Sequence, residues 1–169
     1  KGALVFDIGG GSTEIILLTR TDGGFGKRLI ASVPVGVISV AEEAGGGDFP
    51  ALRAAMDARF APCRAATDNL FDATAQHLLG TSGTVTTLAA IALGLPRYNR
   101  ARVDASWHRT GHLLAVVEEL ASKNASQLAA IGSIGPQRAY LMLPGCAIFA
   151  AICALWPAPM LSVADRGLR

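Results

Sequence analysis

The most constraining feature of this chain is an apolar run that ends in an acid and three consecutive glycines. The sequence reads Ala-Leu-Val-Phe-Asp-Ile at 3–8, Gly-Gly-Gly-Ser-Thr-Glu at 9–14 and Ile-Ile-Leu-Leu at 15–18. Because Ile15, Ile16 and Thr19 are β-branched, the second run favours a strand over a helix. The pattern therefore predicts two strands joined by a tight turn, and glycines in such a turn let backbone amides approach an anion closely.

This turn does not match either of the two common glycine loops that bind nucleotides. A Walker loop requires Gly-Lys-Ser/Thr at the start of a helix, and no lysine follows these glycines. The dinucleotide fingerprint requires a further glycine where Glu14 stands. Asp7 and Glu14 flank the turn and could together hold a hard cation such as Mg²⁺. The alternative is a purely structural hairpin with a flexible tip.

Composition indicates a folded domain without a nucleic-acid or membrane signature. The chain has 169 residues, of which 51% are hydrophobic and 17% charged, with a net charge of +2. This length suits one domain, and the balance of charge argues against a nucleic-acid partner. No apolar stretch reaches the roughly 18 residues of a membrane helix. The chain shows no secretory leader, and its three cysteines are an odd number without metal-ligand spacing, which favours the cytoplasm. Both ends of the sequence are expected to be truncated.

Periodicity and breaker residues predict an α/β protein whose chain begins with three strands in a meander. Strands are expected at 3–8, 14–19, 27–35, 76–79 and 160–164. Helices are expected at 37–44, 51–60 with a break at Pro62 and a continuation to Leu70, 85–93, 107–122, 126–132 and 141–155. Asp48 is expected to cap the second helix. Cys146 and Cys153 are expected to pack as small apolar groups in the last helix.

A second glycine loop, Gly80-Thr81-Ser82-Gly83-Thr84, lies between a predicted strand and an amphipathic helix. Ser82 or Thr84 can cap that helix, and the free amides of its first turn favour an anion. An ordinary capped turn would have the same sequence. Two such loops after two strands predict a cleft lined by both.

Residues 7–14 resemble the second phosphate motif of the exopolyphosphatase/guanosine pentaphosphate phosphatase family, within the actin, Hsp70 and sugar-kinase superfamily. Residues 80–89, 143–148 and 163–169 are similar to later blocks of that family, in the family's order. The resemblance implies a ribonuclease H-like (actin-like ATPase) lobe with a three-stranded antiparallel meander extended by parallel strands and helices on both faces. Residues 1–169 would form the C-terminal lobe of a two-lobe phosphatase.

For the site, the resemblance implies hydrolysis of terminal phosphoanhydride bonds in inorganic polyphosphate or pppGpp, with Mg²⁺. Asp7 and Glu14 are expected to act in catalysis and to bind the metal. The residues expected to bind phosphate are Gly9, Gly10, Gly11, Ser12, Thr13, Gly80, Ser82 and Gly83. A missing first lobe would supply the base, so this chain alone should hydrolyse little. Tyr140 departs from the family pattern, because relatives often carry an acid there.

Two other functions stay open at this stage. A small-molecule kinase lobe of the same superfamily would bind ATP, and a catalytically silent module would bind a nucleotide or alarmone without turnover. The spacing of Glu14 from Asp7 favours the phosphatase over the kinase. The sequence neither requires nor excludes a homodimer.

Overall fold

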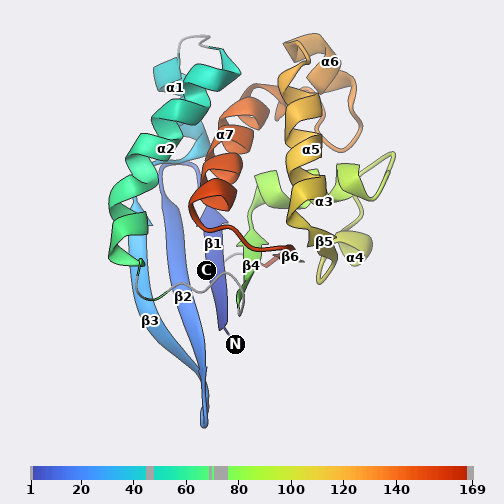
Figure 1. Ribbon diagram of the computed structural model, residues 1–169. Coiled ribbons are helices and arrows are strands. Elements are labelled where there is room, and N and C mark those ends of the chain that lie inside the picture. Colours follow the sequence, from blue (N-terminus) through green and yellow to red (C-terminus); the bar gives the residue numbers. More distant parts are fainter. Residues whose placement is uncertain (1, 45–47, 69, 71–75, 167–169) are drawn as a thin grey trace.

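The computed structural model of the chain describes residues 2–44, 48–68, 70 and 76–166. Within these residues the strands form one mixed sheet, and the helices form a layer beside it (Figure 1). The strands are β1 (Gly2–Ile8), β2 (Thr13–Thr21), β3 (Gly24–Val33), β4 (Gln76–Thr81), β5 (Trp107–Arg109) and β6 (Met160–Ala164). The helices are α1 (Val37–Ala44), α2 (Phe49–Ala66), α3 (Gly83–Ala92), α4 (Arg100–Val103), α5 (Thr110–Ala121), α6 (Ala125–Ala130) and α7 (Ala139–Leu155).

The sheet has the strand order β3-β2-β1-β4-β6-β5. Strands β1, β2 and β3 are successive antiparallel neighbours, whereas β4 lies parallel to β1 and β6 parallel to β4. The predicted meander extended by parallel strands is therefore confirmed. Because β1 and β4 are adjacent and parallel, their carboxyl ends meet at one edge of the sheet, where the two glycine loops begin (Figure 1).

Helix α7 is the centre of the helical layer and lies between α2 and α5 (Figure 1). The Phe149 ring of α7 lies 6.1 Å from the Phe6 ring of β1, measured between centroids, and both side chains are fully buried. Cys146 and Cys153 are also buried on α7, as predicted. None of the described helices combines the length and the apolar character that a bilayer crossing requires.

The hydrophobic core lies between these helices and one face of the sheet. That face carries Leu4 and Phe6 of β1 and Leu17 of β2, all fully buried. The opposite face carries alternate residues such as Ile16 and Ile30, which face each other across β2 and β3, and Ile30 is 61% exposed. The described residues thus show helical cover for one face, and the predicted cover of the second face stays a prediction.

The prediction of one helix over 107–122 is wrong at its start. Residues Trp107–Arg109 form β5, which pairs antiparallel with β6, and α5 begins only at Thr110. A short segment adopts strand geometry when a sheet edge offers unpaired backbone groups. Helical periodicity cannot reveal that partner, because β6 lies about fifty residues further along the sequence.

The predicted break at Pro62 is also wrong, because α2 continues through it to Ala66. Pro62 lies on the exposed side of the helix, where water can bind the carbonyl that loses its intrahelical partner.

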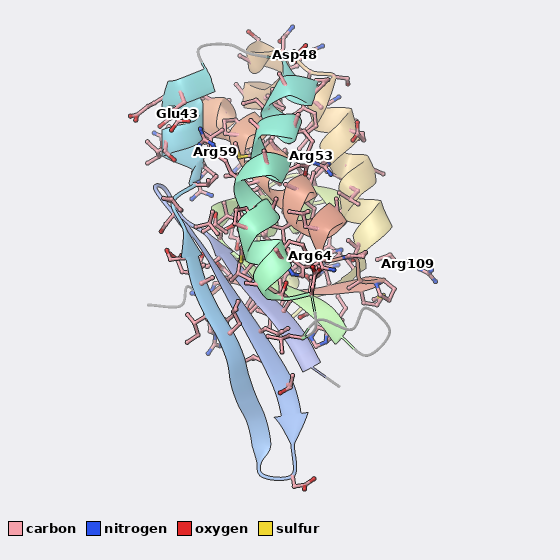
Figure 2. All side chains as sticks on the ribbon, turned by 60° about the vertical axis from the view of Figure 1, so that its left-hand side comes forward. Glu43, Asp48, Arg53, Arg59, Arg64 and Arg109 are labelled. Carbon is pink, nitrogen blue, oxygen red and sulfur yellow. The ribbon has the colours of Figure 1, made fainter. Side chains whose placement is uncertain are left out.

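The predicted cap of α2 is confirmed: the Ala51 amide donates to Asp48 Oδ1 at 2.9 Å. Arg59 of α2 pairs with Glu43 of α1, which joins the two helices at the surface (Figure 2).

The contact between Phe149 and Phe6 should carry much of the stability. We expect Phe149→Ala to lower the free energy of unfolding by about 3–5 kcal/mol, because it leaves a cavity between α7 and the sheet. Tyr140→Ala is the matched control, since Tyr140 lies on the same helix but is 64% exposed. Urea unfolding measures both variants, and equal losses would contradict the assignment of α7 as the central core helix.

Candidate functional site

The first glycine turn closes on itself. The Gly9 amide donates to the Ser12 carbonyl at 2.8 Å, so this amide is used within the turn. None of the described backbone carbonyls outside the strand ladders accepts from the amides of Gly10 and Gly11. Among the three glycines of this turn, the Gly9 amide therefore serves the turn itself, and the amides of Gly10 and Gly11 are the better candidates for an anion.

The start of α1 fixes the carbonyl side of the same turn. The amides of Val37 and Ile38 donate to the carbonyls of Gly9 and Gly10, at 3.0 and 2.9 Å. Gly36 precedes them and packs so closely on Gly10 and Gly11 that a Cβ at this position would overlap their backbone atoms. The carbonyls of the turn thus face α1, and a glycine at 36 is a steric requirement of this arrangement.

The second glycine loop forms the N-terminus of α3. The Ser82 side chain caps the helix by accepting from the Val85 amide at 3.3 Å, as predicted. Its backbone has φ 133° and ψ 167°, a region that essentially only glycine adopts without strain. Strain of this kind costs on the order of 1–3 kcal/mol and persists only where the surrounding structure enforces it. Because the amides of Val85 and Thr86 both donate to Ser82, those of Gly83 and Thr84 are the candidates for an anion in the first turn of α3.

Two other glycines let the surrounding elements approach this loop. A Cβ at Gly80 would lie 2.7 Å from the Phe6 ring, and a Cβ at Gly145 would overlap the Thr84 side chain. Gly80 was predicted to bind phosphate, but the structure gives it a packing role beneath the loop. Gly145 lets α7 pass directly against the start of α3.

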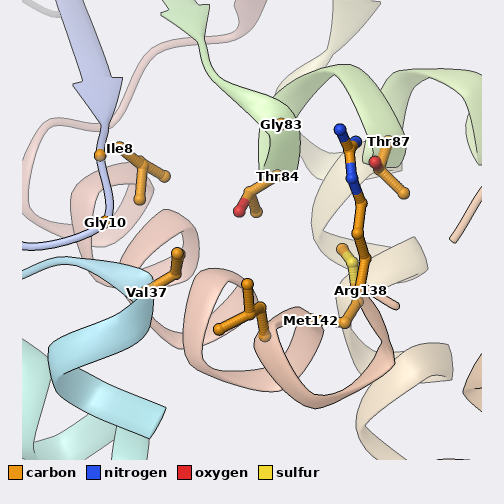
Figure 3. Close-up of a pocket in the computed structure, with 10 residues that line it drawn as sticks. Ile8, Gly10, Val37, Gly83, Thr84, Thr87, Arg138 and Met142 are labelled. Atoms are coloured by element: carbon orange, nitrogen blue, oxygen red, sulfur yellow. The ribbon is translucent and has the colours of Figure 1, made fainter. Parts of the chain in front are cut away.

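The two loops meet at a cavity of about 210 Å³ (Figure 3). Gly10 of the first loop and Gly83 of the second line it from opposite sides, and Arg138 at the start of α7 extends toward α3 beside them. The other lining residues are Ile8, Gly9, Val37, Thr84, Thr87, Leu141 and Met142. No ion pair involves Arg138 among the residues that the structure describes. The cavity therefore brings glycines of both loops together with a cation, and an arginine is a suitable partner for a phosphate group.

Asp7 and Glu14 face each other across β1 and β2, as cross-strand partners in register. The Glu14 carboxylate accepts from Ser12 Oγ at 2.7 Å and from Ser32 Oγ at 3.0 Å, which fixes its orientation. Two adjacent carboxylates are the hard oxygen ligands that Mg²⁺ prefers, so this donor set fits such an ion. Neither acid lines the cavity, and the described residues hold no cluster of three or more metal-ligating side chains.

The remaining predicted residues are used within the fold. Thr13 is fully buried and its hydroxyl donates to the Val35 carbonyl at 2.7 Å, while Ser12 binds Glu14 and Ser82 caps α3. The structure adds Arg138, which sequence reasoning did not assign to the site. Its only signal was the family-like Arg-Ala pair before Tyr140, and that pattern drew attention to Tyr140 instead.

Comparison with known proteins places this geometry in a family. The model of the Ppx/GppA phosphatase family matches residues 1–169. Exopolyphosphatase 2 of Mycobacterium tuberculosis is 31% identical over 143 residues, which are 80% of this chain and 42% of that protein. The Ppx/GppA enzyme of Aquifex aeolicus is 24% identical with a TM-score of 0.78, covering 100% of this chain and 55% of that one. An exopolyphosphatase from Cytophaga hutchinsonii gives a TM-score of 0.82 at 18% identity, with coverages of 98% and 54%.

The chain therefore has the ribonuclease H-like fold of an actin-like ATPase lobe, with two glycine loops at one sheet edge. It belongs to the Ppx/GppA phosphatase family. The chain spans less than half the length of the curated relative and about half of the solved structures. Three residues of the last family-like block, 167–169, lie outside the described part of the chain.

The contact of Gly36 with the first glycine turn generates a direct prediction. Gly36→Ala should cost about 1–3 kcal/mol of stability or more, because the added methyl group meets backbone atoms that cannot rotate away. Gly23→Ala is the matched control, since a Cβ there has no neighbour within 4 Å. Thermal unfolding compares the two variants. A Gly36→Ala variant as stable as wild type would show that the turn does not depend on this approach.

Proposed function

We propose that this chain is the phosphate- and metal-binding lobe of an enzyme that hydrolyses terminal phosphoanhydride bonds of inorganic polyphosphate or pppGpp. The observation that carries this proposal is the convergence of Gly10, Gly83 and Arg138 on one cavity. Family membership supports a phosphatase, and a relative that shares 31% identity is named an exopolyphosphatase.

In this proposal the terminal phosphate occupies the cavity between the two loops. The Gly10 amide contacts its oxygens from one side, and the first turn of α3 contacts them from the other. The Arg138 guanidinium neutralises charge on the phosphates as the bridging bond breaks. Hydrolysis of such a bond depends mainly on positioning and on charge neutralisation, so fixed amides and one arginine are suitable catalytic groups.

Asp7 and Glu14 would hold Mg²⁺ at the edge of this site. When bound, the ion supplies charge neutralisation and orients a water molecule. The hydroxyls of Ser12 and Ser32 both donate to Glu14 Oε1 and so fix this carboxylate. The base that removes a proton from the attacking water is assigned to a second lobe, because no residue of this chain matches it.

The role of Arg138 can be measured on the chain itself. Arg138→Gln should weaken the binding of tripolyphosphate by roughly tenfold or more, because a hydrogen bond to a charged group is worth about 1.5–3 kcal/mol. Arg109→Gln is the control, since Arg109 is an exposed arginine that projects outward from β5 (Figure 2) and does not line this cavity. Isothermal titration calorimetry gives both affinities. Equal weakening by the two variants would point to nonspecific charge attraction.

The catalytic roles of Asp7 and Glu14 are tested in a form of the protein that releases phosphate from polyphosphate. Asp7→Asn and Glu14→Gln should each lower Mg²⁺-dependent phosphate release by orders of magnitude, since each removes a carboxylate ligand. Glu118→Gln changes an exposed acid on α5 and should leave the rate unchanged. Raising the Mg²⁺ concentration should restore part of the lost rate. Rates equal to wild type would remove both acids from the mechanism.

A further inference from the structure

A separate cavity of about 230 Å³ lies between α1 and α2. None of its lining residues lines the cavity between the two glycine loops. Both helices pack on α7, but within the described part of the chain they make few contacts with each other. The space is therefore a gap in the helical layer that a ligand can fill. The residues that form this α1–α2 cavity are Val40, Glu43, Ala51, Leu52, Ala55, Met56 and Arg59.

The floor of the α1–α2 cavity is apolar. Val40 of α1 and Met56 of α2 are each only 2% exposed, and Leu52 of α2 is partly buried against the same core. Ala51 and Ala55 leave the entrance open, because their side chains are short and lie at the surface. An apolar cavity of about 150 Å³ is enough to hold benzene, so this floor suits a branched aliphatic group.

The entrance carries one positive and one negative charge. The Arg59 guanidinium of α2 pairs with the Glu43 carboxylate of α1, and their side chains are 39% and 53% exposed (Figure 2). An ion pair at this exposure contributes little to stability, so a ligand that offers a partner to each charge can open it easily. A carboxylate on the ligand can bind the guanidinium through two parallel hydrogen bonds, and an ammonium group can bind Glu43.

These features select one class of ligand. A nonpolar molecule would make no use of the charged entrance, and a simple anion or cation would leave one of the two charges without a partner. A phosphate ester would bring its negative charge close to Glu43, and like charges repel. A free amino acid with an aliphatic side chain offers an apolar group, a carboxylate and an ammonium group in one small molecule.

We propose that the α1–α2 cavity binds a free amino acid with a branched aliphatic side chain, such as leucine. The side chain of the ligand occupies the apolar floor, where it is removed from water. Its carboxylate contacts Arg59 and its ammonium group contacts Glu43. The ligand thereby completes the packing between two helices that otherwise meet mainly on α7.

Helix α1 links this cavity to the candidate phosphate site. Val40 and Glu43 line the α1–α2 cavity, whereas Val37, one turn earlier, lines the cavity between the glycine loops. The first turn of α1 also donates two amides to the carbonyls of the first glycine turn. A ligand that fixes α1 therefore supports that turn, and by thermodynamic linkage each ligand strengthens the binding of the other. This consequence rests on the proposed function, whereas the binding of the amino acid does not.

The site is tested by titrating the isotope-labelled chain with leucine and recording its amide NMR signals. Leucine should shift signals of α1 and α2, with a dissociation constant on the order of 1 mM. Three related molecules each lack one feature: glycine lacks the side chain, isocaproate the ammonium group and isopentylamine the carboxylate. Glycine should bind roughly tenfold more weakly or worse, because it buries no apolar group. Loss of either charged group should weaken binding by roughly fivefold.

Variants assign the two ends of the ligand. Arg59→Gln should weaken the binding of leucine and isocaproate by roughly fivefold, and should not weaken that of isopentylamine, because it removes only the partner of the carboxylate. Arg53→Gln is the matched control, since Arg53 lies on the same helix and pairs with Asp57 at 3.0 Å but does not line the cavity. Ala55→Leu should abolish leucine binding, because the larger side chain closes the entrance from an exposed position.

The link through α1 is measured by calorimetry, in which saturating leucine should tighten the binding of tripolyphosphate by about fivefold. An unchanged affinity would overturn that link. The assignment of the cavity is overturned if leucine shifts no signals of α1 and α2, if glycine binds as tightly as leucine, or if Arg53→Gln and Arg59→Gln weaken leucine binding equally. Failure of the proposed function is a separate outcome, in which the wild-type chain does not bind tripolyphosphate, and the leucine titration then still decides the assignment of the cavity.

Discussion

The close packing of Gly36 against Gly10 and Gly11 is the constraint on which the candidate site depends. It brings the start of α1 within hydrogen-bonding distance of the first glycine turn, where the amides of Val37 and Ile38 bind two carbonyls of the turn. With its carbonyls held by α1, the turn can present the remaining amides toward the cavity. A phosphate site made of backbone groups needs such support, because a glycine-rich turn has no side chains to fix its own conformation.

The second half of the site depends on α7 in a similar way. Gly145 lets this helix pass against Thr84, and Arg138, which immediately precedes the helix, lines the cavity between the loops. The strained backbone at Ser82 is consistent with a loop that the surrounding structure forces into a functional shape. The same helix thus fills the core through Phe149 and supplies the cation of the site. Stability and ligand binding are therefore coupled through one element.

Charge divides the site into two regions. The cavity between the loops is lined by glycines of both loops and by Arg138, whereas a larger cavity beside it is lined by Asp165, whose carboxylate contacts Tyr98 and Arg100.

The sequence by itself determined the class of fold and the location of both glycine loops, because β-branched runs, glycine turns and caps such as Asp48 act locally. It did not predict β5, because Trp107–Arg109 becomes a strand only where β6 provides an edge. Only the tertiary structure showed that Gly80 packs on Phe6, that the Gly9 amide closes its own turn, and that Arg138 reaches the cavity. These facts depend on contacts between segments that are distant in the sequence. Such contacts decide which polar groups remain available to a ligand, and a local sequence pattern does not show them.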